Sequence, residues 1–284
     1  MPTHQKSPQR KCQPLIEEHR PRSLDEVVGQ AAAVRQISNV LARGWGGRAW
    51  WISGPSGTGK TTLARIIANE GAEGWCTIEL DASQISSSWL DETESTMHLY
   101  GAPPRGGRCW IINEAHGLRR SSCIQRLLVL LDPLPNHVCF IFTTTTEGEQ
   151  LLLDDKVDAP PLLSRCQVVR LESGPKTRDA FAKAVRNIAQ EWDLDSQPLA
   201  DYRYLAETED CNMRFMLQRV ESGLRLPPAP TSGALLAASK TKAKAADNRR
   251  TGACGFCGCE IPKGRKYCGT QHFFAKLHEQ KRRR

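Results

Sequence analysis

The sequence predicts an α/β fold built on a parallel β-sheet, followed by a small three-helix domain and a small cysteine-rich module. Three observations support this expectation. Short apolar runs alternate with segments of helical spacing up to about residue 171, which is typical of a parallel sheet covered by helices. From residue 176 onward the spacing is helical only. Four of the eleven cysteines lie within residues 254–268.

The expected strands are compact apolar runs bounded by polar turns. They are RAWWIS at 48–53, CTIELD at 76–81, RCWII at 108–112, HVCFIFT at 137–143 and QVVRL at 167–171. Between them, LARIIANE at 63–70 and SCIQRLLVLLD at 122–132 have the length and spacing of helices. In a sheet of this kind ligands bind at the carboxyl ends of the strands, so the residues that follow each strand are the candidates for a site.

After residue 175 the sequence pattern changes from helical segments to a linker and then to a basic, cysteine-rich segment. Three helical segments, at 176–192, 198–207 and 212–224, predict a three-helix domain, and a stretch rich in Pro, Ala, Ser and Lys then predicts a linker. We therefore expect five parts: a flexible N-terminus (1–14), an α/β core (15–174), a helical lid (175–224), a linker (225–251) and a basic metal-binding module (252–284).

Charge and composition narrow the functional classes. From residue 240 onward there are 13 Lys and Arg against 3 Asp and Glu, whereas the preceding residues carry 26 basic and 28 acidic side chains. The basic character therefore belongs to the tail, which favours contact with nucleic acid, with a solvated solubility tail as the alternative. The N-terminal residues lack the apolar region of a secretory signal, and no apolar run approaches 18 residues. We expect a cytoplasmic protein that does not span a membrane.

A phosphate-binding loop is the most specific motif. GPSGTGKT at 54–61 fits the spacing G-x-x-x-x-G-K-[ST] and lies between an expected strand and an expected helix. Backbone N–H groups of such a loop surround phosphates, its lysine reaches the β- and γ-phosphates, and its Ser or Thr hydroxyl binds Mg²⁺. The predicted nucleotide-binding residues are Gly54, Pro55, Ser56, Gly57, Thr58, Gly59, Lys60, Thr61 and Thr62, with Thr61 as the Mg²⁺ ligand.

Other segments, in order along the chain, resemble one protein family. They are HRPRSLDEVVGQ at 19–30, ELDAS at 79–83, the run from NEAHGL to TTTTEG at 113–148, LLSRC at 162–166 and EDCNMRFMLQRVE at 209–221. Together these segments resemble the AAA+ clamp-loader ATPases, namely the replication factor C small subunits and their bacterial relatives. The resemblance covers roughly residues 15–223. It implies an AAA+ parallel-sheet ATPase core with a small three-helix lid.

The resemblance also implies roles for individual residues. Val28 and Gly29 would line the adenine pocket, and Glu114 would orient and deprotonate the attacking water. Thr145 would be the sensor 1 residue, and Arg214 the sensor 2 residue that reaches the γ-phosphate from the lid. Arg165 would be an arginine finger acting on the nucleotide of a neighbouring subunit. As alternatives, Arg165 would be a surface arginine beside a buried cysteine, and Arg214 would pair with carboxylates of the lid.

Asn113 departs from the family pattern, which has a carboxylate before the catalytic glutamate. The amide keeps an oxygen acceptor of similar reach but loses the negative charge next to the Mg²⁺ site. We expect ATP and Mg²⁺ to bind, with weaker metal affinity and slow hydrolysis that depends on assembly. Restoring the carboxylate with Asn113→Asp should then raise hydrolysis roughly tenfold. An inert, ATP-bound structural subunit is the alternative.

The cysteine-rich module has the spacing of a zinc site. Cys254 and Cys257 form a C-x2-C pair, and after ten intervening residues Cys268 and His272 form a C-x3-H pair, which suits tetrahedral Zn²⁺. Cys259 is the alternative to Cys257 as a ligand. The surrounding Lys and Arg residues favour nucleic-acid binding, with a protein-docking module as the alternative. The run also resembles zinc-ribbon and treble-clef knuckles.

These features predict a clamp-loader-like AAA+ ATPase that uses ATP to act on DNA or on a DNA-bound partner in replication or repair. The expected partners are DNA and other AAA+ subunits in a ring or partial ring, and a sliding clamp is a further candidate. After Gly223 the sequence offers only the linker and the zinc module, where clamp-loader subunits carry a helical collar domain that holds the ring together. The alternatives are a hydrolysis-deficient assembly subunit and another AAA+ DNA-maintenance motor, such as a branch-migration or fork-repair ATPase.

Overall fold

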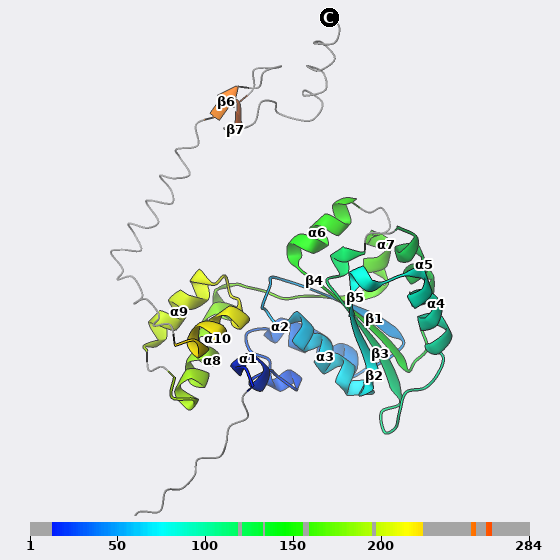
Figure 1. Ribbon diagram of the computed structural model, residues 1–284, viewed down its shortest axis with the longest axis horizontal. Helices are drawn as coiled ribbons and strands as arrows, with labels where there is room; N and C mark the ends of the chain where they lie inside the picture. Colours follow the sequence, from blue (N-terminus) through cyan, green and yellow to red (C-terminus); the bar gives the residue numbers. More distant parts are fainter. Residues whose placement is uncertain are drawn as a thin grey trace, which may run out of the picture. The chain divides into compact units, whose positions relative to one another are not determined.

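A computed structural model describes residues 13–118, 121–132, 134–155, 159–194, 197–223, 251–253 and 260–262 of the chain. The chain divides into two compact units, Met1–Pro227 and Pro228–Arg284. The first unit contains the α/β core and a group of three helices (Figure 1). The described residues of the second unit form two short strands, β6 (Thr251–Ala253) and β7 (Glu260–Pro262), which pair in antiparallel fashion.

The core is a five-stranded parallel sheet. Its strands are β1 (Arg48–Ser53), β2 (Ala72–Asp81), β3 (Gly107–Asn113), β4 (Val138–Thr144) and β5 (Cys166–Arg170). Their order in the sheet is β2-β3-β4-β1-β5, and every adjacent pair is parallel. The first strand therefore lies inside the sheet, with its neighbours supplied by later parts of the chain. Because the strands are parallel, the carboxyl ends of β1, β3 and β4 lie next to one another on the same side of the sheet.

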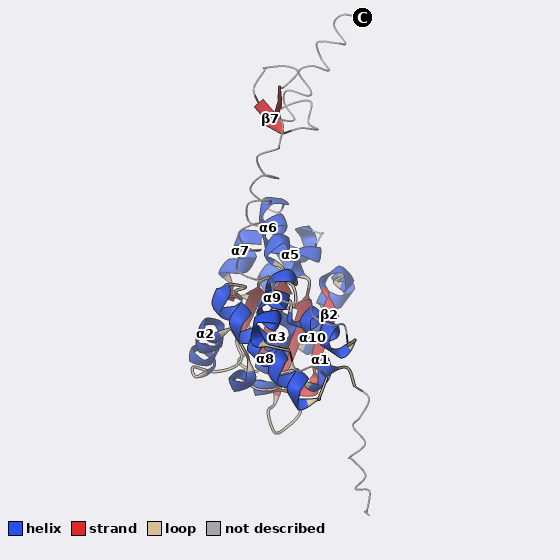
Figure 2. Ribbon diagram, turned by 90° about the vertical axis from the view of Figure 1, so that its left-hand side faces the viewer, coloured by secondary structure: helices blue, strands red, loops and turns tan. Residues whose placement is uncertain are grey.

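Helices cover both faces of the sheet, so that the red strands of Figure 2 lie between blue helices. One face packs on α2 (Ala31–Leu41) and α3 (Lys60–Gly71), and the other on α4 (Ser87–Thr96), α5 (Ser121–Leu131) and α7 (Ala159–Ser164). Successive residues of the central strands enter opposite cores, as Trp50 and Trp51 of β1 do, and both are fully buried. Burial on both faces explains why these strands are continuous apolar runs.

The lid consists of α8 (Pro175–Glu191), α9 (Leu199–Thr208) and α10 (Met213–Glu221) around a core of its own. Proline at the first position of α8 suits a helix start, because that position needs no backbone N–H donor. The N-terminal helix α1 (Leu15–Glu18) packs on α10, where the Leu15 N–H donates to the Glu221 carboxylate at 3.3 Å. The segment before the core is thus fixed to the lid.

The structure confirms the expected parallel sheet and corrects several boundaries. Strand β1 matches its predicted range, whereas β2 begins four residues earlier than expected, at Ala72. The spacing gave no indication of α2, α4, α6 (Thr146–Asp155) or the 3₁₀ turns η1 (Leu24–Glu26), η2 (Ala82–Gln84) and η3 (Ala115–Gly117). Within the described residues, none of the helices has the length and apolar character that crossing a membrane requires.

Candidate nucleotide-binding site

The phosphate-binding loop joins β1 to α3, as the motif predicts. Gly57 and Gly59 adopt φ of 73° and 102°, in the left-handed region that favours glycine. A Cβ atom on Gly57 would overlap the side-chain amide of Asn212, just before α10. The Gly57 carbonyl also accepts a hydrogen bond from the Met213 N–H at 3.2 Å. Gly57 is therefore the point where the loop and the lid meet.

Lys60 lies at the start of α3 with its side chain folded into the loop. It is 8% exposed, and its ammonium donates to the carbonyl oxygens of Gly54 at 2.9 Å and Pro55 at 2.8 Å. Burial lowers the pKa of Lys60, and the nearby charge of Arg214 lowers it further, against the attraction of Glu114 and Glu147. An ammonium carries three N–H donors, so one remains for an anion. The loop thus holds a desolvated cation where phosphate would lie.

Oxygen and amide groups lie together near the carboxyl ends of the adjacent strands β2, β3 and β4 and at the start of α3. The Asn113 side-chain oxygen accepts from the Thr143 hydroxyl of β4 at 2.8 Å and lies 3.4 Å from the Thr61 hydroxyl of α3. On its other side, the Asn113 amide donates to the Glu79 carboxylate of β2 at 2.8 Å. Hydroxyl, amide and carboxylate oxygens are hard donors, and this chemistry suits Mg²⁺. The residues present fit the predicted metal.

Glu114 follows Asn113 at the end of β3 and turns away from the sheet. Its φ of 51° is left-handed, which is uncommon for a residue with a side chain. The carboxylate is half exposed and lines the cavity beside the phosphate-binding loop. His116 Nδ1 lies 3.5 Å from its Oε2 and also 3.1 Å from the Thr144 hydroxyl. The carboxylate therefore lies at the wall of the cavity, beside the phosphate-binding loop.

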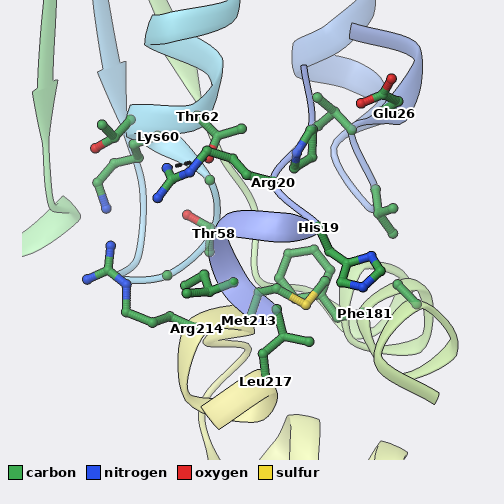
Figure 3. A pocket seen from close by; sticks show the side chains of 18 of the residues that line it. His19, Arg20, Glu26, Thr58, Lys60, Thr62, Phe181, Met213, Arg214 and Leu217 are labelled. Carbon is green, nitrogen blue, oxygen red and sulfur yellow. Dashed lines mark hydrogen bonds between the residues drawn. The ribbon is translucent and has the colours of Figure 1, made fainter. Parts of the chain in front are cut away.

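A single cavity joins the loop, the N-terminal segment and the lid. Figure 3 shows two ends of different chemistry, with Lys60 and Arg214 pointing into one end and Phe181 at the other. The apolar lining residues of the cavity include Ile16, Val27, Val28, Phe181, Ile188 and Leu217, and His19 lies beside Phe181 (Figure 3). Such a division suits a ligand with a flat apolar base at one end and an anionic chain at the other.

Arg214 enters the cavity from the first turn of α10. In the part of the chain that the structure describes, Arg214 forms no ion pair; the carboxylate of Glu209 binds Arg219 at 3.0 Å instead. The predicted alternative, in which Arg214 pairs with lid carboxylates, therefore lacks such a contact here. Because Asn212 caps this helix and the Met213 N–H binds the loop, the position of Arg214 is tied to that of the phosphate-binding loop.

Besides Gly54, Pro55 and Asn113, whose contacts are given above, three further predicted residues of the described part of the chain lie outside the cavity lining, namely Gly29, Thr145 and Arg165. Gly29 follows Val28 and does not line the cavity. A Cβ atom on Gly29 would lie 3.0 Å from the Phe181 ring, and the Gly29 carbonyl accepts a hydrogen bond from the Thr177 hydroxyl at 3.0 Å. The Thr145 hydroxyl accepts from the Gly148 N–H at 3.0 Å and so caps α6. The third residue, Arg165, follows α7.

Arg165 is held by a two-pronged ion pair on the surface of the core. Its Nε and Nη2 donate to the two carboxylate oxygens of Asp132 at 2.8 and 2.9 Å, and its side chain is 31% exposed. The adjacent Cys166 is buried, and burial raises the pKa of its thiol to about 12. The arginine is thus displayed at the surface, away from the cavity of its own chain. This placement fits either a finger acting in trans or a surface arginine beside a buried cysteine.

Sequence reasoning missed Glu79, Thr143 and Phe181 as parts of this site. Thr143 and Glu79 meet Asn113 across neighbouring strands, and Phe181 joins the apolar end from α8. For Glu79 and Thr143 the only sequence signal was that each is a polar residue near the end of an expected strand. The predicted zinc ligands Cys254, Cys257, Cys268 and His272, and the alternative Cys259, lie outside the described residues.

Comparison with known proteins agrees with this geometry. Residues 51–172 match the family model described as "ATPase family associated with various cellular activities (AAA)". The DNA polymerase III subunit gamma of Buchnera aphidicola subsp. Schizaphis graminum is 32% identical over 155 residues, which cover 46% of this chain and 42% of that protein. The Replication factor C small subunit of Haloarcula marismortui is 29% identical over 184 residues, covering 63% and 53%.

The chain spans about half the length of these relatives. A solved structure of a Thermotoga maritima RuvB mutant has a TM-score of 0.56 at 19% identity, covering 72% of this chain and 64% of that chain, and this likeness concerns the fold alone. The matched region contains the second half of β1, all of β2 to β5, and the cavity residues Ser56 to Thr62 and Glu114. The chain therefore contains an AAA domain, matched over residues 51–172, that is homologous to clamp-loader subunits of the DNA polymerase III gamma and Replication factor C small-subunit type.

Proposed function

We propose that this protein is a clamp-loader-like AAA+ ATPase that binds ATP with Mg²⁺, hydrolyses it, and acts on DNA or a DNA-bound partner in replication or repair. One observation carries the proposal: Lys60, Glu114 and Arg214 come from three separate segments and line one cavity beside the phosphate-binding loop. The similarity to subunits of replication proteins supports the biological setting. The proposal places the protein in the cytoplasm.

The proposal assigns a role in ATP binding or hydrolysis to each of the following side chains. The adenine would lie at the apolar end by Val28 and Phe181, and Lys60 and Arg214 would bind the phosphates. Thr61 and Asn113 would hold Mg²⁺, which would supply positive charge to neutralise the phosphates. The water's oxygen would attack the γ-phosphorus while its proton passes to the Glu114 carboxylate, and ADP would leave. Thr145 would act as sensor 1 from the end of β4.

The proposal assigns Arg165 to a neighbouring AAA+ subunit in a ring or partial ring. Its exposure at the surface, away from its own cavity, supports a role in trans. The exposed pair with Asp132 would have to open for the guanidinium to reach another subunit's nucleotide. Exposed ion pairs are screened by solvent and contribute little, so this opening has a small cost. A sliding clamp is a further proposed partner.

The test of this function is steady-state ATP hydrolysis with and without primed DNA. We expect slow turnover by the chain alone and at least about a tenfold rise when primed DNA and partner subunits are added, because an arginine in trans then completes the site. Addition of a sliding clamp distinguishes clamp loading from branch migration or fork repair, since only a clamp loader should respond to the clamp. ATP binding without turnover under every condition would contradict the enzymatic proposal.

A second candidate, an ATP-holding assembly subunit, is favoured by one observation, namely that Asn113 is neutral where the family pattern has a carboxylate. Such a subunit would bind ATP without hydrolysing it and would activate its neighbour through Arg165. In a complex with partner subunits, Arg165→Ala would then abolish the partners' turnover, whereas Glu114→Gln would leave the total turnover unchanged.

We also propose that residues 252–284 form a zinc module that binds DNA. The supporting feature is the spacing of Cys254, Cys257, Cys268 and His272 within a basic segment. Purified protein should contain one Zn²⁺ per chain, and either Cys254→Ser or Cys268→Ser should remove it by metal analysis while ATP binding persists. If the wild-type protein binds DNA in a salt-dependent way and these variants do not bind it, the result would support DNA binding over protein docking. Protein that contains no zinc would overturn the proposal.

A further inference from the structure

Glu79 has no assigned role in the proposed reaction, yet it is the acidic group in contact with Asn113. The register of the sheet pairs Asp81 with Asn113 and Glu79 with Ile111, so Glu79 and Asn113 are diagonal neighbours on adjacent strands. Both side chains lie on the face that packs on α3, from which Thr61 and Arg65 project. Diagonal neighbours of this kind are within reach of polar side chains.

The hydrogen bonds fix the orientation of the Asn113 amide. The Thr143 hydroxyl donates to its oxygen at 2.8 Å, whereas the Glu79 carboxylate can only accept and therefore binds its NH₂ group, also at 2.8 Å. Consequently the amide oxygen is directed towards the Thr61 hydroxyl, which is the expected Mg²⁺ ligand. With a carboxylate at position 113 this contact with Glu79 would be a repulsion instead of a hydrogen bond.

An ion pair with Arg65 holds the Glu79 carboxylate in place beside Asn113. Arg65, whose side chain is 43% exposed and therefore screened by solvent, donates to both carboxylate oxygens of Glu79, at 2.8 and 3.2 Å. The Oε1 atom of Glu79 accepts from both Arg65 and the Asn113 amide.

We propose that Glu79 supplies the negative charge that the Mg²⁺ site lacks at Asn113, with the Asn113 amide as the link between them. A carboxylate at the NH₂ end of an amide polarises it and increases the negative charge on the oxygen that faces the metal. Carboxylates that orient and polarise a metal ligand in this way are common outside the coordination shell. Glu79 is thus a positioning residue. This inference rests on the proposed binding of Mg²⁺·ATP.

The measurement is the Mg²⁺ concentration that half-saturates binding of a fluorescent ATP analogue, compared in a double-mutant cycle. Glu79→Gln removes the charge but keeps an oxygen that can accept from Asn113, so it separates charge from position. Asn113→Asp with Glu79→Gln moves the charge to residue 113 and keeps one amide donor between the two side chains. Binding is also measured without Mg²⁺, where the inference predicts little difference among the variants.

We expect Glu79→Gln to raise the half-saturating Mg²⁺ concentration about tenfold in the native background. The same change should raise it less than about twofold in the Asn113→Asp background, because the charge is then already present. The hydrolysis gain predicted for Asn113→Asp alone should appear in full only with Glu79→Gln, which removes the repulsion. Equal effects in both backgrounds, or no effect in the native one, would overturn the inference.

A matched control is Glu73→Gln on the same strand, where Glu73 pairs with Arg105 at 3.6 Å instead of with Asn113. It should leave the Mg²⁺ dependence unchanged, and a shift equal to that of Glu79→Gln would show a general effect of surface charge and overturn the inference. Failure of the proposed function is distinguishable, since the wild-type protein would then not bind the ATP analogue at any Mg²⁺ concentration.

Discussion

Lys60→Ala is expected to weaken ATP binding about tenfold to a hundredfold, because the one remaining N–H donor of Lys60 would form a charge-assisted hydrogen bond to phosphate that contributes roughly 1.5–3 kcal/mol. Lys60 is already desolvated inside the phosphate-binding loop and is held there by two backbone carbonyls. Its ammonium is therefore prepared to bind anions without the cost of removing it from water. Direct titration with a fluorescent ATP analogue gives the affinity.

Lys183→Ala is the matched control for this experiment. Lys183 lies in α8, outside the cavity lining, and its exposed side chain pairs with Asp179 at 2.8 Å. Its removal should leave ATP affinity within about twofold, because exposed ion pairs contribute little to the structure. The melting temperature of both variants shows whether the fold survives. Near-normal ATP affinity in a folded Lys60→Ala protein would refute the nucleotide assignment.

Glu114→Gln is expected to reduce hydrolysis by about 10²–10⁴-fold while ATP remains bound, because an amide does not take the proton of the attacking water. The change should not disturb the fold. The Glu114 side chain is half exposed, and the Nδ1 atom of His116 lies 3.5 Å from its carboxylate. Phosphate release at saturating ATP measures the reaction, and titration with the ATP analogue measures binding.

Glu94→Gln provides the control for the Glu114 experiment. Glu94 is an exposed acid of α4 that pairs with Arg126 at 2.9 Å, and it does not line the cavity. Its replacement should change neither hydrolysis nor binding. If Glu114→Gln retained more than about a tenth of wild-type turnover, another group would have to accept the proton, and the assignment of Glu114 as the general base would be wrong.

The structure changes the interpretation of Asn113. From the sequence alone, Asn113 stands where the family pattern has a carboxylate, and Asn113→Asp would simply restore the missing negative charge. In the structure Asn113 forms hydrogen bonds to Thr143 and Glu79, and the latter contact requires an amide donor. The substitution would therefore add a charge and remove a hydrogen bond at the same time. For this reason the two positions have to be changed together.

The sequence by itself determined the features that depend on short stretches of chain. The phosphate-binding loop is local, because its glycine conformations and the start of α3 are encoded within residues 54–61, and the structure places Lys60 and Thr61 as the motif predicts. The parallel sheet was predictable for a similar reason. Strands buried on both faces must be continuous apolar runs, so their residues identify them.

Only the tertiary structure decided which distant residues meet. Glu79 and Thr143 reach Asn113 because β2 and β4 flank β3, and strand order does not follow from the sequence of any one strand. Phe181 and Arg214 enter the cavity because the lid packs on the loop at Gly57. Side-chain contacts of this kind depend on register and on the packing of separate elements, whereas a motif records only neighbours along the chain. The charge environment of the proposed Mg²⁺ site is therefore a property of the fold.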